Sequence, residues 1–478
     1  MAAIITDQFR RNSASSVLAD ILDGVNDYYV GIGKTDSWPA NGELEETAPT
    51  FSAPLPVGSV AEMKEVRNNL ISLLKLDASK SRIIIPNVAW KLDNKHKPYA
   101  ANDNTCFTPT TVGAVTTYPC YAIADSKIWL CLLSDGSGLN NIPSAQALYT
   151  KYTASTGYTW IAIANIENIV DVPFNTDQFI AVKLDPTQYD DGNPLTLLPG
   201  EIANNATKGH VYGFTIANGG TGYTSNPTAF LIGDGTVSPI PLTITRTGNV
   251  ITGVTFTSTN ATTGFNNASV RFSTTGGGSG AVIIPNIAPI EGFGPTILNN
   301  LPTWFLGLAA NFDGKLLDGG VTDADIDAQL LSYRQISVIK NPTITSTSPD
   351  TITSADALKY LTITGSISSI NAAVGDIITL NGSGVTAKAF FDSYIYSSST
   401  GTGKLYYHQN DSSQVNYAAF PSTGQIYIND IIATQFTYSS VTESEYIHNT
   451  GEVLFLENRR PISRNENQKE EIKLVIQF

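Results

Sequence analysis

The stretch Val211-Tyr-Gly-Phe-Thr-Ile216 has a counterpart about 40 residues later, Ile251-Thr-Gly-Val-Thr-Phe256. Further positions keep a similar spacing, with Gly222-Tyr223 matching Gly264-Phe265 and Phe230 matching Phe272. In each copy two strand-forming runs flank a glycine, which lacks a Cβ and therefore tolerates the positive φ of a tight turn. The surrounding residues 205–290 carry almost no charge. The sequence therefore predicts a repeat β module over 205–290, inserted into the fold around it.

A second β module is predicted over 346–440. Within it, Val374-Gly-Asp-Ile-Ile-Thr-Leu380 is partly echoed by Ser422-Thr-Gly-Gln-Ile-Tyr-Ile428, and strand-forming runs at 387–396 and 404–408 lie between them. Short strands separated by glycine turns are typical of a small barrel. We expect a second insertion here, with a small β-barrel-like fold.

The remaining segments, 1–204, 291–345 and 441–478, mix helix and strand patterns and form the predicted core. Helices are predicted over 12–22, over 59–75 with Ser59 and Glu62 as a capping box, and from Thr322 to near Leu331. Strands are predicted at 120–123, 128–133, 158–163, 179–184, 334–339, 452–456 and 471–478. The last two are expected to close the core as a C-terminal hairpin. The predicted fold class is α+β and β-rich, a mixed core with two inserted all-β modules.

Composition excludes several classes of partner and location. The net charge is −14 and only 15% of the 478 residues are charged, so a phosphate backbone or an anionic membrane finds little basic surface. The N-terminus lacks a signal-peptide pattern, and no apolar run is long enough to span a bilayer. Three cysteines, without a Cys-x-x-Cys, favour a reduced compartment over a disulfide framework. We expect a protein that matures in a cytoplasm and binds neither nucleic acid nor membrane.

Sequences that resemble catalytic or binding motifs each fail at a required position. Gly33-Lys34-Thr35 looks like the end of a P-loop, but Tyr28 stands where that loop needs a glycine. The aspartates at 323, 325 and 327 have calcium-loop spacing, but Ala328 replaces the loop's glycine. Asp190-Asp191 lies in a turn, where adjacent carboxylates point apart. The four histidines are scattered, at His96, His210, His408 and His448. We predict no catalytic residue, cofactor or metal.

Several segments read together resemble one family. They are Tyr333-Arg-Gln-Ile-Ser-Val-Ile-Lys-Asn-Pro342, Gly451-Glu-Val-Leu-Phe-Leu-Glu-Asn-Arg-Arg-Pro-Ile462, Glu470-Glu-Ile-Lys-Leu-Val-Ile-Gln-Phe478, residues 28–38 with Gly33, Lys34 and Trp38, and Pro54-Leu-Pro-Val-Gly-Ser-Val60. In this order they resemble the dimer-forming baseplate wedge subunit of T-even-type contractile-tailed bacteriophages. The resemblance covers roughly 1–200, 295–345 and 441–478. The two β modules depart from it.

The resemblance implies a structural protein and not an enzyme. Its expected role is to hold neighbouring wedge proteins together in the virion's tail baseplate, as a homodimer. The residues implied as structural or interface positions are Arg334, Glu457, Asn458, Arg459, Arg460 and Pro461. Of Arg459 and Arg460, we expect one to be buried and the other to face a partner chain.

Two alternatives remain open at the level of sequence. The chain has 21 tyrosines, many of them in the β modules, which also suits a receptor- or glycan-binding virion adhesin. A glycan-degrading tail enzyme has only unpaired carboxylates in its favour. Binding of glycans by the modules would favour the adhesin, whereas loss of an activity on removing one carboxylate would favour the enzyme.

Overall fold

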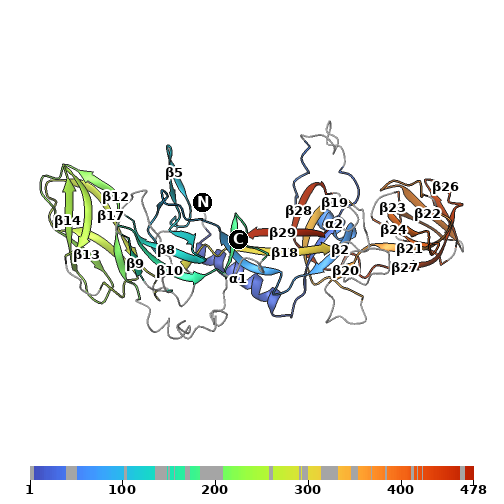
Figure 1. Cartoon of the computed structure of the whole chain (residues 1–478), viewed down its shortest axis with the longest axis horizontal. Helices are drawn as coiled ribbons and strands as arrows, with labels where there is room; N and C mark the ends of the chain where they lie inside the picture. Colours follow the sequence, from blue (N-terminus) through green and yellow to red (C-terminus); the bar gives the residue numbers. More distant parts are fainter. Residues whose placement is uncertain are drawn as a thin grey trace. The chain divides into compact units, whose positions relative to one another are not determined.

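The computed structural model describes residues 5–38, 51–101, 105–134, 148, 151–154, 157–166, 173–182, 208–257, 262–289, 292, 300–313, 332–345, 354–367, 369–382, 385–410, 414–416, 418–422, 424–462 and 469–478. These residues form twenty-nine strands and only two helices, α1 (Asp7–Leu22) and α2 (Val60–Asn68), so the chain is β-rich (Figure 1). The chain divides into two compact units. One contains 1–18, 82–307 and 475–478, and the other contains 19–81 and 308–474. Neither helix is long and apolar enough to cross a membrane.

A five-stranded antiparallel sheet collects segments from the whole length of the second unit. Its strands, in order, are β20 (Ser354–Asp356), β2 (Leu70–Lys75), β1 (Tyr28–Gly33), β19 (Tyr333–Lys340) and β28 (Glu452–Ile462). The central strand β1 is buried at every position because it has a neighbour on each side and is covered on both faces. β28 is an edge strand.

The predicted helix over 59–75 is only half correct. Helix α2 begins after Ser59, whose Oγ accepts the N–H of Glu62 at 3.1 Å, and the Glu62 carboxylate accepts the N–H of Gly58 at 2.7 Å. The helix ends at Asn68, and residues 70–75 form strand β2 instead. The first five residues of β2 are buried, because the strand lies inside the sheet. Burial on both faces produces a continuous apolar run, whose spacing alone does not distinguish strand from helix.

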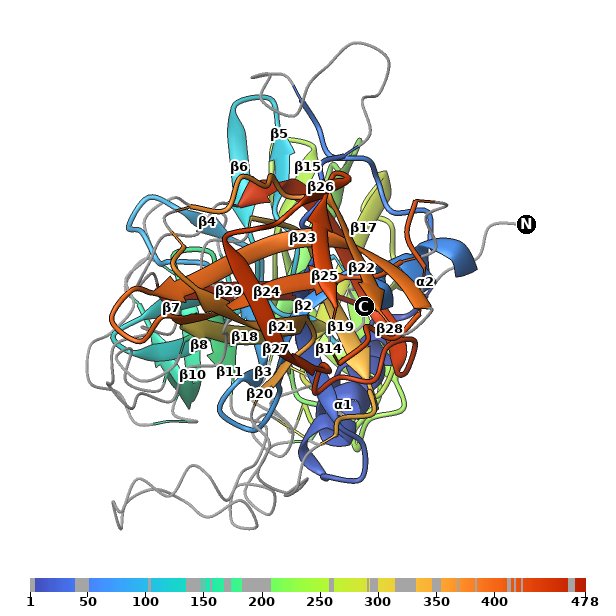
Figure 2. The ribbon, with the colours of Figure 1, turned by 90° about the vertical axis from the view of Figure 1, so that its right-hand side faces the viewer.

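Seven strands of the second unit form one antiparallel sheet with its own core. Its order is β26 (Ile431–Ile432), β25 (Gln425–Ile428), β22 (Ile377–Gly382), β23 (Val385–Ser397), β24 (Thr402–His408), β21 (Lys359–Gly365) and β27 (Phe436–Thr442), seen in Figure 2. Apolar side chains from these strands meet in one cluster that includes Leu361, Leu380 and Leu405. Among the described residues β26 and β27 do not pair with each other, so the sheet keeps two edges where a closed barrel has none.

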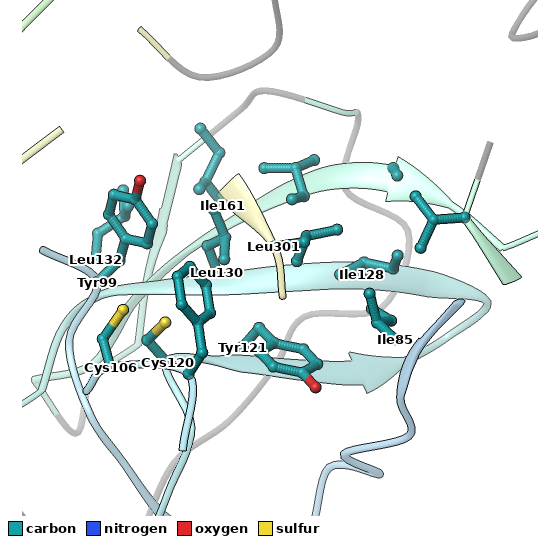
Figure 3. Packing of buried hydrophobic residues seen from close by; sticks show 14 of the residues in the cluster. Ile85, Tyr99, Cys106, Cys120, Tyr121, Ile128, Leu130, Leu132, Ile161 and Leu301 are labelled. Carbon is teal, nitrogen blue, oxygen red and sulfur yellow. The ribbon is translucent and has the colours of Figure 1, made fainter. Parts of the chain in front are cut away.

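The first unit contains a four-stranded sheet with buried side chains on both of its faces. Its order is β7 (Tyr121–Ala124), β8 (Lys127–Leu133), β10 (Thr159–Asn165) and β9 (Lys151–Thr153). Along β8, Ile128, Leu130 and Leu132 enter the core shown in Figure 3. The alternating residues Trp129 and Cys131 enter a second cluster that contains Trp160. A small sheet of β4 (Lys95–His96), β6 (Val115–Tyr118) and β5 (Thr110–Val112) precedes β7.

The repeat of strand, glycine turn and strand is confirmed. Gly222 and Gly264 have φ of 79° and 80°, and each precedes a buried aromatic ring, Tyr223 or Phe265. The first copy supplies β12 (Val211–Thr221), β13 (Ala229–Gly233) and β14 (Ile240–Thr247), and the second supplies β15 (Val250–Phe256), β16 (Ala268–Phe272) and β17 (Ser279–Ile287). The third strand of each copy pairs with the first strand of the other, β14 with β15 and β17 with β12. The middle strands pair together, so the copies interlock.

The C-terminal segment does not form the predicted hairpin. β28 pairs with β19, whereas β29 (Lys469–Gln477) ends a different sheet of order β11 (Phe179–Val182), β3 (Ser81–Pro86), β18 (Phe305–Asp313) and β29. The alternation predicted for the last strand is confirmed, since Ile472 and Leu474 are buried and Lys473 is exposed. Local alternation predicts a strand but not its partner. The predicted helix from Thr322 lies outside the described residues.

Candidate functional site

The residues singled out from the sequence lie together at one end of the five-stranded sheet. Arg334 is the second residue of β19, and Glu457 to Pro461 occupy the last part of β28 beside it. The register places Gln335 opposite Asn458, and the Gln335 amide donates to the Asn458 Oδ1 at 3.0 Å. Between this pair and the next, Tyr333 with Ile462, the ladder is irregular. The structure thus brings together positions that are more than a hundred residues apart.

Polar groups of β28 are tied to the segment 51–54 and to Trp38. The Asn458 amide donates to the Pro54 carbonyl at 2.9 Å, and the Arg460 guanidinium donates to the Phe51 carbonyl at 2.8 Å. The Trp38 indole N–H donates to the Arg459 carbonyl at 2.9 Å. Pro461 is compatible with this strand because an edge position leaves one side free of ladder hydrogen bonds.

The expectation that Arg459 or Arg460 is buried is wrong. The Arg459 guanidinium binds both oxygens of the Glu457 carboxylate, at 2.8 and 3.0 Å, and its side chain is 39% exposed. Arg460 is also exposed. Residues i and i+2 of a strand share a face, so Glu457 neutralises Arg459 locally at the surface. Arg334, on the neighbouring strand, is buried instead.

Arg334 belongs to a largely buried polar cluster that the sequence did not reveal, in which only Asp36 is partly exposed. We name Thr35, Asp36, Arg334, Asp392 and His408 the junction cluster. Arg334 donates to the carbonyl oxygen of Thr35, which follows strand β1. The Thr35 hydroxyl donates to the Asp392 carboxylate on β23 at 2.7 Å. The cluster therefore joins the five-stranded sheet to the seven-stranded sheet within one unit.

His408, the last residue of β24, lies between two carboxylates. Its Nδ1 is 2.9 Å from both oxygens of Asp392, and its Nε2 is 3.4 Å from Asp36 Oδ2. The Asp392 side chain is fully buried and that of His408 is 4% exposed. An isolated charge at such depth is costly, so charged groups there are stable only when paired. Two carboxyl groups face two basic groups, His408 and Arg334, and their formal charges cancel.

The surroundings keep His408 protonated. Burial alone lowers the pKa of the imidazole, but the charges and hydrogen bonds of Asp392 and Asp36 outweigh it and raise the pKa to about 10. Burial likewise raises the pKa of Asp36, but its contact with His408 and the positive charges of Lys34 and Arg334 lower that pKa overall. Both ring nitrogens of His408 are therefore donors at neutral pH.

This geometry suits a clamp better than proton transfer. A general base needs a pKa near the working pH and a free lone pair, and a protonated His408 has neither. The Thr35 hydroxyl binds Asp392 and not the imidazole, so this cluster does not form a nucleophile–histidine pair. What the cluster does is fix two sheets against each other through directional, charge-assisted contacts.

The sequence held one signal for this cluster. Asp392 interrupts the strand-forming run Ala-Phe-Phe-Asp-Ser-Tyr-Ile-Tyr that ends at Tyr396, and a carboxylate inside a buried strand requires a partner. The partner Thr35 is 357 residues away in the chain, so its identity follows only from the fold. The four histidines are predicted to be exposed or hydrogen-bonded single histidines, and His408 is a hydrogen-bonded one whose partner Asp392 the sequence did not identify.

The other motifs considered have structural roles where they are described. Lys34 follows β1 with φ of 62°, pairs with Glu65 at 3.3 Å and lies 4.8 Å from the Trp38 ring centre, so it belongs to a turn. Trp129, Trp160 and Trp304 are buried core residues. Among the residues that the structure describes, no group of three or more His, Cys, Asp or Glu side chains could hold a metal ion. The aspartates at 190, 191, 323, 325 and 327 lie outside the described residues. No family model and no curated protein matches the chain.

Proposed function

We propose that this chain is a structural subunit of a contractile phage tail baseplate wedge. The observation that carries the proposal is where the family-like segments lie. Residues 28–38, 333–342 and 451–462 are far apart in the sequence, yet they contain β1, β19 and β28, which are neighbours in one sheet. Pro54, the first residue of the next family-like segment, and Phe51 just before it bind side chains of β28 through their carbonyls. If two proteins share a core, the segments in which their sequences are similar should lie together in the folded structure, as these do.

The two β modules are proposed as insertions into this wedge-type core. Each has a hydrophobic cluster of its own, around Leu231 and Phe265 in the first and around Leu361 and Leu405 in the second. A module with its own core adds stability of its own, and loop closure makes a long insertion only modestly more costly than a short one. The junction cluster supplies the fixed attachment of the second module.

The proposed partners are the neighbouring wedge proteins and a second copy of this chain. A scaffold subunit needs rigid strands and large contact surfaces, and it needs no side chain with a pKa tuned to catalysis. The low share of charged residues, 15%, suits extensive burial, because interface cores are depleted in charge.

The test is a cryo-EM map of the intact tail of the phage that encodes this chain. We expect density for the five-stranded sheet in the baseplate ring, in paired copies that contact other wedge chains. Density only at fibre tips or on receptor-facing spikes would contradict it and would favour the adhesin. Sedimentation of the purified chain at micromolar concentration provides the second measurement, with a salt-resistant dimer as the expected result.

A further inference from the structure

Two of the three cysteines stand on either side of a hairpin. Cys106 precedes β5 and Cys120 follows β6, so the residues between them contain the whole hairpin. The tip of the hairpin is exposed, with Val112 at 75% and Val115 at 52%. Both cysteines are fully buried in the core of the first unit. The base of the hairpin is therefore buried while its tip is free.

The backbone holds the two cysteines at a separation that suits a disulfide. The Cys120 N–H donates to the Cys106 carbonyl at 2.8 Å. Extended backbone segments joined by such bonds lie about 4.7–4.9 Å apart. Disulfides span Cα separations of about 4.4–6.8 Å. Lys97 fixes the turn that bears Cys106, because its Nζ donates to the carbonyls of Thr105 and Thr108 at 2.9 and 2.8 Å.

The two side chains lie side by side as well (Figure 3). The Cys106 and Cys120 thiols are within hydrogen-bonding contact, and Figure 3 shows both sulfur atoms pointing the same way beside Tyr99. Cys131 supplies a natural comparison. Its N–H donates to the Cys120 carbonyl at 2.8 Å, so its backbone is equally close. Its side chain, however, enters the cluster of Trp129 and Trp160 on the other face of the sheet, where Sγ contacts the Leu133 carbonyl at 3.3 Å.

We propose that Cys106 and Cys120 are a convertible pair: they stay as thiols in a reducing cytoplasm and form a disulfide when the chain meets a low-molecular-weight disulfide. In the first step one cysteine thiolate attacks oxidised glutathione, forms a mixed disulfide and releases one glutathione thiolate. In the second step the other cysteine thiolate attacks the cysteine sulfur of that mixed disulfide and releases the second glutathione. The two protons lost by the cysteines are taken up by the two glutathiones, so the protein is oxidised by two electrons and the oxidant is reduced by two.

The bond would tie the ends of the hairpin together covalently. A cross-link between residues close in sequence constrains only the loop it encloses, here 107–119. Its effect is therefore local: the hairpin keeps its position when its base opens transiently, and the rest of the fold is unchanged. The buried thiols react through such openings, so we expect oxidation of the native chain to be slow, on the order of minutes to hours.

The test uses the full-length reduced chain incubated with oxidised glutathione, and in parallel the chain refolded in a glutathione redox buffer. Trypsin leaves Cys106 and Cys120 in one peptide, 96–127, because Lys97 is followed by proline, whereas Cys131 falls in the next peptide. The expected product is peptide 96–127 lighter by two hydrogen atoms, in both arms. The Cys131→Ser variant should give the same product, and Cys106→Ser and Cys120→Ser should abolish it.

A functional readout accompanies the mass measurement. Thermolysin, which cleaves at exposed apolar residues, should cut within 107–119 more slowly in the oxidised chain than in the reduced chain. Cys131→Ser should retain that difference. The proposal is overturned if the folded chain keeps free Cys106 and Cys120 in both arms, or if the cross-link joins Cys131 to either of them.

Discussion

The surroundings of His408 keep its imidazole protonated at neutral pH, where an exposed histidine is mostly neutral. Its folded pKa of about 10 lies above the ordinary value of 6.5. A group whose pKa is raised by folding stabilises the folded state fully below its unfolded pKa, and loses that contribution as the pH rises through the folded pKa. The groups facing the ring are Asp392 on β23, Asp36 after β1 and, through Thr35, Arg334 on β19.

We expect the free energy of unfolding to fall as the pH rises from about 6.5 to 10, measured by urea denaturation at a series of pH values. His408→Gln should flatten this slope and destabilise the protein at neutral pH by about 3–5 kcal/mol, since it leaves Asp392 buried without its counterion. His210→Gln is the control, because burial lowers the pKa of His210 to about 4, below the window. An unchanged slope in His408→Gln would show that other groups govern it.

Arg334 and Arg459 offer a contrast between a buried and an exposed guanidinium. Removing Arg334 takes away the donor to the Thr35 carbonyl and one of the two buried cations of the junction cluster, and Arg334→Ala should cost about 3–5 kcal/mol. Arg459→Ala removes a partly exposed pair with Glu457 and should cost at most about 1 kcal/mol. Chemical denaturation of the two variants gives the order directly, and equal losses would contradict the assignment.

At the scale of elements, the sequence predicted strands well and their partners poorly. The runs at 128–133 and 334–339 lie in β8 and β19 with nearly unchanged ends. The apolar spacing from Met63 onward continues through 70–75, so the sequence predicts a helix where the structure has strand β2. The pairing of β28 with β19 rather than β29 depends on the assembled sheet, and no local pattern carries that information.

Glycines at the repeat turns should differ in their tolerance of alanine. Gly222, Gly248 and Gly264 all have positive φ, so alanine at each should cost about 1–2 kcal/mol. A Cβ at Gly248 meets nothing within 4 Å and one at Gly222 meets only ordinary contacts at 3.7 Å, whereas one at Gly264 would lie 2.8 Å from Thr236 Oγ1. Gly264→Ala should therefore be the most destabilising of the three in thermal unfolding. Equal melting temperatures would show that the Thr236 side chain moves aside without cost.

At the scale of the whole molecule, the sequence marked out the β modules by composition but did not define their limits in space. β20, at 354–356, falls within the predicted module 346–440 but pairs with β2 in the five-stranded sheet. At the edge of the repeat module, Tyr212 and Ala288 pack into the core of the first unit. Composition indicates roughly where along the sequence a module lies, whereas its boundary in the fold depends on which side chains pack into which core.

The insertion model makes a prediction for a deletion. Gly213 and Asn286 are paired across β12 and β17, so residues 214–285 can be replaced by a two-residue Asn-Gly turn without moving either end. Tyr212 and Ala288 are retained, so the core of the first unit keeps its packing. We expect a cooperatively folded chain whose buried Trp129 and Trp160 keep their native fluorescence. Non-cooperative unfolding of this variant, with solvent-exposed tryptophan emission, would refute the insertion model.

The interlocked repeat has a consequence for how such a module arises. In the module, the other copy pairs with the first strand of each copy and covers its apolar face. A single three-stranded copy would therefore have an unpaired first strand and an exposed apolar face. One copy on its own would have to associate with a second identical chain. The module is therefore equivalent to a homodimer whose subunits have been fused through the short turn at Gly248. Tandem duplication of one gene segment is the direct route to such a fusion. It converts an assembly that depends on protein concentration into one that forms within each single chain.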